Sequence, residues 1–111
     1  MSFQHQNLAE GRWFTFSFYE QMANVGSEVI RALNWQKKNN VQYSKLAYER
    51  ALELLYLTCD DKKNIPRIRE LTRLYEYLAD CYFDNKNYKL SASGLENYFL
   101  AFTYAARNSS A

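Results

Sequence analysis

The sequence is poor in residues that break or cross-link a chain. Only three glycines and one proline occur among 111 residues. Sheets joined by many tight turns need more of both, so their scarcity favours long helices with few breaks. The two cysteines, Cys59 and Cys81, have no metal-ligand spacing and are too few for a disulfide framework. We expect two unpaired thiols packed as small apolar residues, which fits a reducing cytoplasm.

An excess of charge of one sign and long apolar runs are also absent. Fourteen Lys and Arg against twelve Asp and Glu give a net charge of +2. That balance does not by itself indicate a nucleic-acid or membrane-surface protein. No run approaches the roughly 18 consecutive apolar residues of a membrane span. The N-terminal segment lacks the basic start and apolar core of a signal peptide, so we expect a cytoplasmic protein.

Catalytic motifs are scarce. The single histidine, His5, lies in a polar N-terminal segment, so no Cys–His or Ser–His pair is expected. There is no glycine-rich phosphate loop and no Glu-x-x-His pattern for a metal in a bundle core. Glu28, Glu53 and Glu70 border apolar seams, where a boundary ion pair is the better interpretation. We predict no enzyme activity, metal, cofactor or small-molecule substrate.

Helical periodicity is abundant. The stretch 43–58, YSKLAYERALELLYLT, is the most apolar in the chain. Its apolar stripe comprises Leu46, Ala47, Ala51, Leu54, Leu55 and Thr58. A helix this apolar must be covered on several sides, so we expect the rest of the chain to surround it.

Three further helices are predicted, at about 18–36, 66–83 and 94–107. The short Asn-Asn link at 39–40 makes the first two helices antiparallel neighbours. Residues 88–92 are predicted to be a loop, a short turn or the early start of the last helix. The predicted fold is therefore all-α, a closed antiparallel four-helix up-and-down bundle. It forms a single domain at residues 13–108, after a flexible N-terminal tail at residues 1–12.

Local signals mark the helix starts. Ser17 and Glu20 form a capping box before the first helix, and Ser93 and Glu96 form a second one before the last. Pro66 is placed at the first position of the third helix, where proline is tolerated best.

Two further features predict packing. Gly26 lies mid-helix, where we expect the close approach of a neighbouring helix. The core seam of the third helix is predicted to comprise Ile68, Leu71, Tyr75, Leu78 and Tyr82.

Three segments together suggest a family. They are EQMANVGSEVIRALNW, YSKLAYERALELLYLT with RIRELTRLYEYLADCYF, and NYFLAFTYAAR. Across residues 13–107 the chain resembles a group of small, all-helical bacterial and archaeal proteins of about this length. The resemblance implies a prokaryotic, cytoplasmic, helical protein. No activity is established for that group, so no functional residue carries over.

Aromatic residues are the first functional candidates. They make up 17% of the chain and include ten tyrosines, too many for one small core. Tyrosine is enriched at interfaces, so an exposed aromatic set indicates a docking surface. The interface candidates are Trp13, Phe14, Phe16, Tyr19, Trp35 and Tyr104. We predict a non-enzymatic interaction or assembly protein that forms a homo-oligomer or binds a protein partner.

A basic cluster supports an alternative function. Its members, between the second and third helices and at the start of the third, are Lys62, Lys63, Arg67, Arg69 and Arg73. Beside tyrosines such a cluster can hold a phosphate backbone and stack bases. The alternative prediction is an RNA- or DNA-binding accessory factor. A solvated face balanced by nearby acidic residues explains the same pattern.

Overall fold

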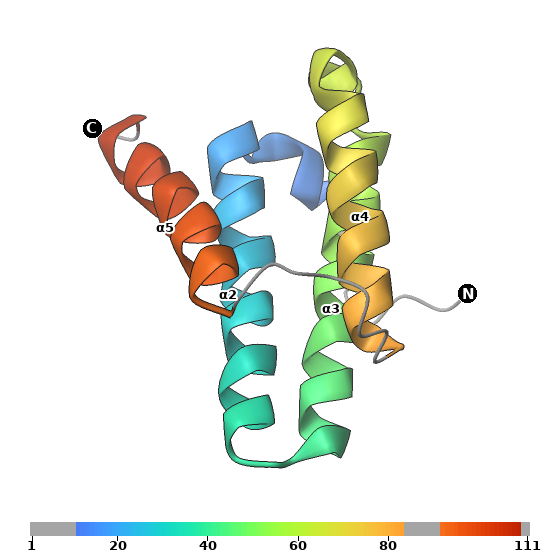
Figure 1. The fold of residues 1–111 in the computed structure, drawn as a ribbon. Coiled ribbons are helices and arrows are strands. Elements are labelled where there is room, and N and C mark those ends of the chain that lie inside the picture. The colour runs from blue at the N-terminus through green and yellow to red at the C-terminus, as the bar shows by residue number, and fades with distance from the viewer. Residues whose placement is uncertain (1–10, 84–91, 110–111) are drawn as a thin grey trace.

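A computed structural model describes residues 11–83 and 92–109, and these are helical with no strand (Figure 1). The elements in chain order are η1 (Arg12–Thr15), α2 (Phe18–Lys37), α3 (Val41–Asp60), η2 (Lys62–Arg67), α4 (Ile68–Tyr82) and α5 (Ala92–Ser109). The predicted all-α four-helix bundle is confirmed. Most of the predicted tail lies outside the described residues, but Arg12 already belongs to the short helix η1.

The predicted start of the first long helix is confirmed. The Ser17 hydroxyl accepts a hydrogen bond from the Glu20 amide at 3.2 Å, and the Glu20 carboxylate accepts one from the Ser17 amide at 2.9 Å. At the other end, Asn39 has a positive φ of 59°. The Asn40 side chain then caps α3 by accepting from the Tyr43 amide at 3.0 Å. Both devices follow from the sequence, because Asn tolerates the left-handed conformation and caps helices well.

Two predicted boundaries need correction. Pro66 does not open α4; it lies inside the 3-10 helix η2, and α4 begins two residues later at Ile68. The side chain of Asp61 accepts from the Lys63 amide, which winds the chain into the tighter helix before α4 begins. Ser93 does not cap the last helix, because α5 already begins at Ala92 and places Ser93 in its first turn.

The long helices alternate in direction and lie side by side in the order α5, α2, α3, α4 (Figure 1). The sequence predicts α3 as the centre, but α2 and α3 share that position. Met22, Val25 and Val29 of α2 are fully buried, as are Ala51 and Leu55 of α3. Helix α2 is buried on both sides because α5 packs on the side that α3 leaves open.

The predicted role of Gly26 is confirmed. A Cβ atom at this position would lie 2.6 Å from Cβ of Phe99, closer than any real contact allows. Phe99 is fully buried, and Leu95 is buried one turn earlier. Only glycine lets α5 approach α2 this closely, so Phe99 and Gly26 form the anchor of the last helix.

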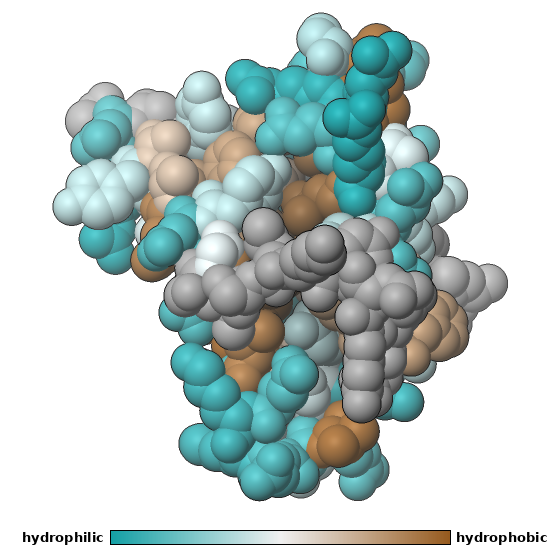
Figure 2. All heavy atoms as spheres, in the orientation of Figure 1, coloured by the Kyte–Doolittle hydropathy of each residue, from teal (hydrophilic) through white to brown (hydrophobic). Residues whose placement is uncertain are grey.

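The predicted closure of the bundle is not realised, because α4 and α5 do not pack closely on each other (Figure 1). The Tyr98 hydroxyl donates to Glu70 at 2.9 Å and links them. Figure 2 shows apolar side chains over α5 and in the hollow between α5 and the upper part of α4. Leu46 and Ile68, both predicted in core seams, are 38% and 41% exposed. In this open arrangement, no described helix covers the side of α3 that carries Leu46 or the side of α4 that carries Ile68.

Candidate interaction surfaces

Trp13 lies in the core and not on a docking surface. Its side chain is only 1% exposed, and Nε1 donates to the Thr58 hydroxyl at 3.1 Å. The prediction of an exposed Trp13 is wrong, because η1 folds the indole back over the ends of α2 and α3. Phe16 packs edge-on against Trp13 with ring centroids 5.5 Å apart, and Phe14 is also half-buried. These rings hold η1 in place and leave little area for a partner.

Behind Trp13, a buried polar network links η1, α2, α3 and η2. The Gln21 amide donates to the Asp61 carboxylate at 2.8 Å and to the Trp13 carbonyl at 3.1 Å. The Asn64 amide donates to the Gln21 side-chain oxygen and to the Thr58 carbonyl, both at 2.9 Å. The sequence analysis missed this network, because its residues lie as far as 43 positions apart. Its hydrogen bonds join η1, α2, α3 and η2 to one another, so we interpret the network as structural.

Two members of the basic cluster are engaged within the chain. The Lys63 ammonium pairs with Asp61 and donates to the Phe14 carbonyl at 3.2 Å. Burial by itself raises the pKa of Asp61, but the hydrogen bonds from Lys63 and Gln21 outweigh it and hold that pKa below its usual value. The Arg67 guanidinium lies 4.2 Å from the ring centroid of Phe18. Neither cation is available to a phosphate backbone without losing these contacts.

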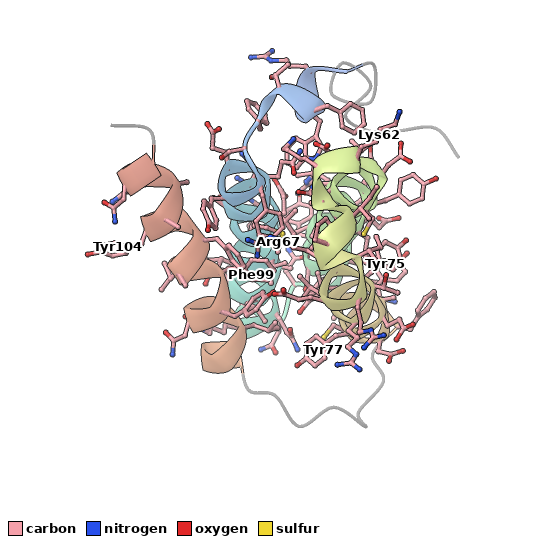
Figure 3. The ribbon with its side chains drawn as sticks, turned by 90° about the horizontal axis from the view of Figure 1, so that it is seen from above. Lys62, Arg67, Tyr75, Tyr77, Phe99 and Tyr104 are labelled. Atoms are coloured by element: carbon pink, nitrogen blue, oxygen red, sulfur yellow. The ribbon has the colours of Figure 1, made fainter. Side chains whose placement is uncertain are left out.

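The other three members, Lys62, Arg69 and Arg73, are exposed. Within the described part of the chain none of them forms an ion pair. In Figure 3, which looks down on the bundle, Lys62 lies at the periphery, while Arg67 points in toward the centre. All five members are exposed, and the structure divides them into two cations with contacts within the chain, Lys63 and Arg67, and three with no ion pair among the described residues.

Tyr104 lies on the outer side of α5, and Tyr19 lies on α2 beside that helix. Tyr104 is 71% exposed and points away from the bundle in Figure 3. Tyr19 is 37% exposed, and its ring centroid lies 6.5 Å from that of Phe102. We define the α5 edge face as its exposed outer residues, Asn97, Leu100, Ala101, Tyr104 and Asn108. These five residues are uncharged, but the exposed Arg107 borders them at the C-terminal end of the same face.

Trp35 lies at a separate place, on the α2–α3 hairpin. It is half-buried and meets the exposed ring of Tyr43 edge-on, with centroids 4.9 Å apart. The Lys38 ammonium lies 5.2 Å from the Trp35 ring. Together with Leu46 and Arg50, the two rings line a shallow cleft of about 260 Å³. Trp35 therefore belongs to a different surface from Tyr104, and the six interface candidates do not form one patch.

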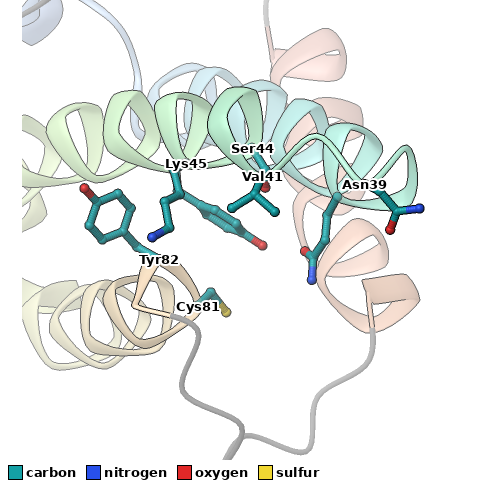
Figure 4. A pocket seen from close by; sticks show the side chains of 8 residues that line it. Asn39, Val41, Ser44, Lys45, Cys81 and Tyr82 are labelled. Carbon is teal, nitrogen blue, oxygen red and sulfur yellow. The ribbon is translucent and has the colours of Figure 1, made fainter.

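A second cavity of about 240 Å³ lies between the start of α3 and the end of α4 (Figure 4). Two of its polar side chains, those of Ser44 and Lys45, already have partners. The Ser44 hydroxyl donates to the Ala32 carbonyl at 2.9 Å, and the Lys45 ammonium lies 5.7 Å from the Tyr82 ring. The volume is also below the roughly 300 Å³ at which ligand pockets usually begin. The cavity therefore offers little to a small-molecule substrate.

The thiols lack the features of an activated nucleophile. Neither Cys59 nor Cys81 is in a disulfide, as predicted. Burial raises the pKa of both thiols, although hydrogen bonds from Tyr77 and Tyr48 partly offset this at Cys81. Activated thiols have lowered pKa values, so both groups fit the predicted packing role better. Among the described residues, no group of His, Cys, Asp and Glu is placed to hold a metal ion.

Comparisons with protein-family models, curated proteins and solved structures found no match. The family resemblance inferred from the sequence therefore stays a prediction. In residues 11–83 and 92–109, no helix combines the length and hydrophobicity needed to cross a bilayer. The functional argument rests on the surfaces of this chain alone.

Proposed function

We propose that this chain is a non-enzymatic assembly protein that self-associates through the α5 edge face. The observation that carries the proposal is an edge helix packed mainly on one neighbour, whose outer face exposes Leu100 and Tyr104 and has its one charged residue, Arg107, near its C-terminal end. Leu100 is 48% exposed and Tyr104 is 71% exposed. An apolar helix face of this kind gains free energy when it is covered.

A second copy is the occupant that best matches this face. Around Leu100 and Tyr104 it has no charge for an oppositely charged partner to neutralise, since the exposed Arg107 lies at its C-terminal end, and two such apolar centres are compatible with each other. Contacts of this kind between copies are usually two-fold symmetric. We place the assembly in a prokaryotic cytoplasm, a setting supported by the two thiols that are not disulfide-bonded.

The test is the molar mass of the protein at tens of micromolar, measured by light scattering after size exclusion. We expect the wild type to be larger than a monomer and the double variant Leu100→Glu, Tyr104→Glu to have a lower mass. Val41→Glu is the matched control, because Val41 is 65% exposed but lies at the start of α3. A monomeric wild type, or a double variant of unchanged mass, would refute the proposal.

RNA or DNA binding is the second candidate. It is favoured by the exposed Lys62, Arg69 and Arg73, which form no ion pair with another described residue, and it is weakened by the engagement of Lys63 and Arg67 within the chain. A gel shift with single-stranded RNA should then show binding that Arg69→Ala, Arg73→Ala weakens and that salt weakens further. No shift with the wild type at low salt would exclude this candidate.

A further inference from the structure

The outer flank of α4 carries an apolar stripe that is largely uncovered. The stripe comprises Ile65, Ile68, Thr72, Tyr75, Ala79 and Phe83. Their spacing of three or four residues is that of a helix-packing seam. Ile65, Ile68 and Phe83 are 64%, 41% and 74% exposed. Tyr75 is half-buried and points away from α5, whereas Tyr77 lies on the side of α4 that faces α5 (Figure 3).

A segregated row of charges runs beside this stripe. Arg69 and Arg73 occupy the N-terminal half of α4, and Glu76 and Asp80 occupy the C-terminal half. The four are spaced at i, i+4, i+7 and i+11, so they share the outward face. None of them forms an ion pair in the described part of the chain.

This row goes against two local rules of helix stability. Like charges at i, i+4 repel each other, and both Arg69 with Arg73 and Glu76 with Asp80 are placed so. The helix dipole also favours anions near the N-terminus and cations near the C-terminus, which is the reverse of this order. Within the helix only the i, i+3 spacing of Arg73 and Glu76 is favourable, so a partner outside it would stabilise the row further.

We propose that α4 pairs antiparallel with α4 of a second copy, about a two-fold axis near Leu74. In that register Arg69 faces Asp80 of the second copy, and Arg73 faces Glu76. Each charge then meets its opposite, and the two-fold axis repeats both pairs. A row with two cations followed by two anions is complementary to itself only when the copies run in opposite directions.

The apolar stripe fits the same axis. In the register of the charge pairs, Ile68 lies level with the gap between Ala79 and Phe83 of the second copy, and Thr72 lies level with the gap between Tyr75 and Ala79. The Thr72 hydroxyl already donates to the Ile68 carbonyl at 2.7 Å, so it needs no other partner in an apolar contact. The charges give the register, and the stripe is compatible with it because its side chains can interdigitate with those of the second copy.

The charges set direction more than affinity. Exposed ion pairs contribute only about 0–1 kcal/mol each, so most of the binding free energy comes from covering the stripe. A nucleic acid would use the two arginines but would be repelled by Glu76 and Asp80. The full row is explained by a second copy and only half of it by a polyanion.

The experiment is a charge swap. The variants are Arg69→Glu, Arg73→Glu, which has only acidic side chains in the row, and Glu76→Arg, Asp80→Arg, which has only basic ones. Both are made in the Leu100→Glu, Tyr104→Glu background, so that the α5 edge face does not contribute. Sedimentation velocity measures association, and circular dichroism checks that each variant is folded.

We expect the background protein to dimerise and each single-sign variant to raise its dissociation constant about tenfold or more. Mixing the two variants should give a heterodimer, and combining all four substitutions in one chain should restore the homodimer. Raising the salt concentration should weaken the heterodimer most.

A monomeric background protein would overturn this proposal and leave the α5 proposal standing. A mixture that stays monomeric, or single-sign variants that still dimerise normally, would also overturn it. So would loss of single-stranded RNA binding in the acidic variant with its dimerisation intact, because the arginines would then serve the polyanion. If the protein dimerises through α4 and the α5 substitutions do not change its molar mass, only the proposed self-association through α5 is refuted.

Discussion

Helices α4 and α5 occupy opposite ends of the same row of helices, but they are attached to it by different means. Helix α5 is attached through an apolar contact, with Phe99 packed into the space that Gly26 leaves on α2. Helix α4 packs through Leu71 and Leu78, and a buried polar network also fixes η2, from which it starts.

The outer faces of α4 and α5 also differ, in the number of charged residues that they carry. The outer face of α5 carries a single charge, Arg107, near its end, whereas that of α4 carries four charged residues in two blocks beside its apolar stripe. The core does not constrain either outer face, so the difference points to separate contacts outside the chain. The predictions below test how each helix is attached, because a loosely attached helix could not present such a surface.

The largest effect is expected for the apolar anchor of α5. Phe99→Ala should lower the free energy of unfolding by about 3–5 kcal/mol, because it empties a fully buried site. Urea unfolding followed by circular dichroism measures this loss. Leu100→Ala, the exposed neighbour on the same helix, is the control and should have a small effect. Equal losses for the two variants would show that α5 is not anchored at Phe99.

The polar anchor of α4 should depend on pH. Asp61 has a lowered pKa in the folded protein, so its contribution to stability is complete above its unfolded pKa of about 3.9. That contribution should be lost as the pH falls from there toward the lower folded pKa. Asp61→Asn should lower the free energy of unfolding at pH 7 by about 1.5–3 kcal/mol, because a buried, charge-assisted network loses its acceptor.

Measuring the free energy of unfolding at several pH values distinguishes a role of the Asp61 charge from packing alone. The stability difference between the wild type and Asp61→Asn should shrink as the pH falls below about 4. Asp60→Asn, one residue earlier and exposed, should show neither the loss at pH 7 nor this convergence. A constant difference across the series would mean that Asp61 acts by packing alone.

A smaller effect is expected at the close contact itself. Gly26→Ala should lower the free energy of unfolding by about 1–2 kcal/mol, because the clash with Phe99 outweighs the better helix propensity of Ala. Ser27→Ala, on the exposed side of α2, should be neutral or slightly stabilising. Thermal melts of both variants measure the contrast. A stabilised Gly26→Ala protein would show that α5 can move away from α2 at little cost.

The smallest effect concerns the link between the two edge helices. Tyr98→Phe removes the 2.9 Å hydrogen bond to Glu70 and should lower the free energy of unfolding by about 0.5–1 kcal/mol. Burial first, and then the hydrogen bond and charge of Glu70, raise the pKa of Tyr98. Urea unfolding of Tyr98→Phe and the wild type measures this difference in the free energy of unfolding. Tyr104→Phe, whose ring points away from the bundle, should have no measurable effect.

Much of the fold could be predicted from local rules. The capping box at Ser17, the stop at Asn39 and the close approach at Gly26 each depend on a few neighbouring residues or on one missing side chain. These signals act within one helix or one contact, so they are readable along the chain. The long helices and their alternating directions follow from them and from the short links.

The candidate surfaces could be predicted only in part. Tyr104 and Tyr19 are exposed as expected, and Arg69 and Arg73 point outward together. Trp13 could not be placed, because aromatic character alone does not tell a core indole from an interface indole. The charge row of α4 is present in the sequence, but its meaning appears only once α4 is known to lie at an edge.

The sequence by itself determined the helices, their caps and their order of directions, because hydrophobic spacing and capping residues act over a few positions. Only the tertiary structure decided that Trp13 is enclosed, that Gln21, Asp61 and Asn64 meet, and that α4 and α5 lie at the two edges. Those outcomes depend on which sides of α2 and α3 are covered. Coverage is set by contacts between residues far apart in the chain, which periodicity cannot encode.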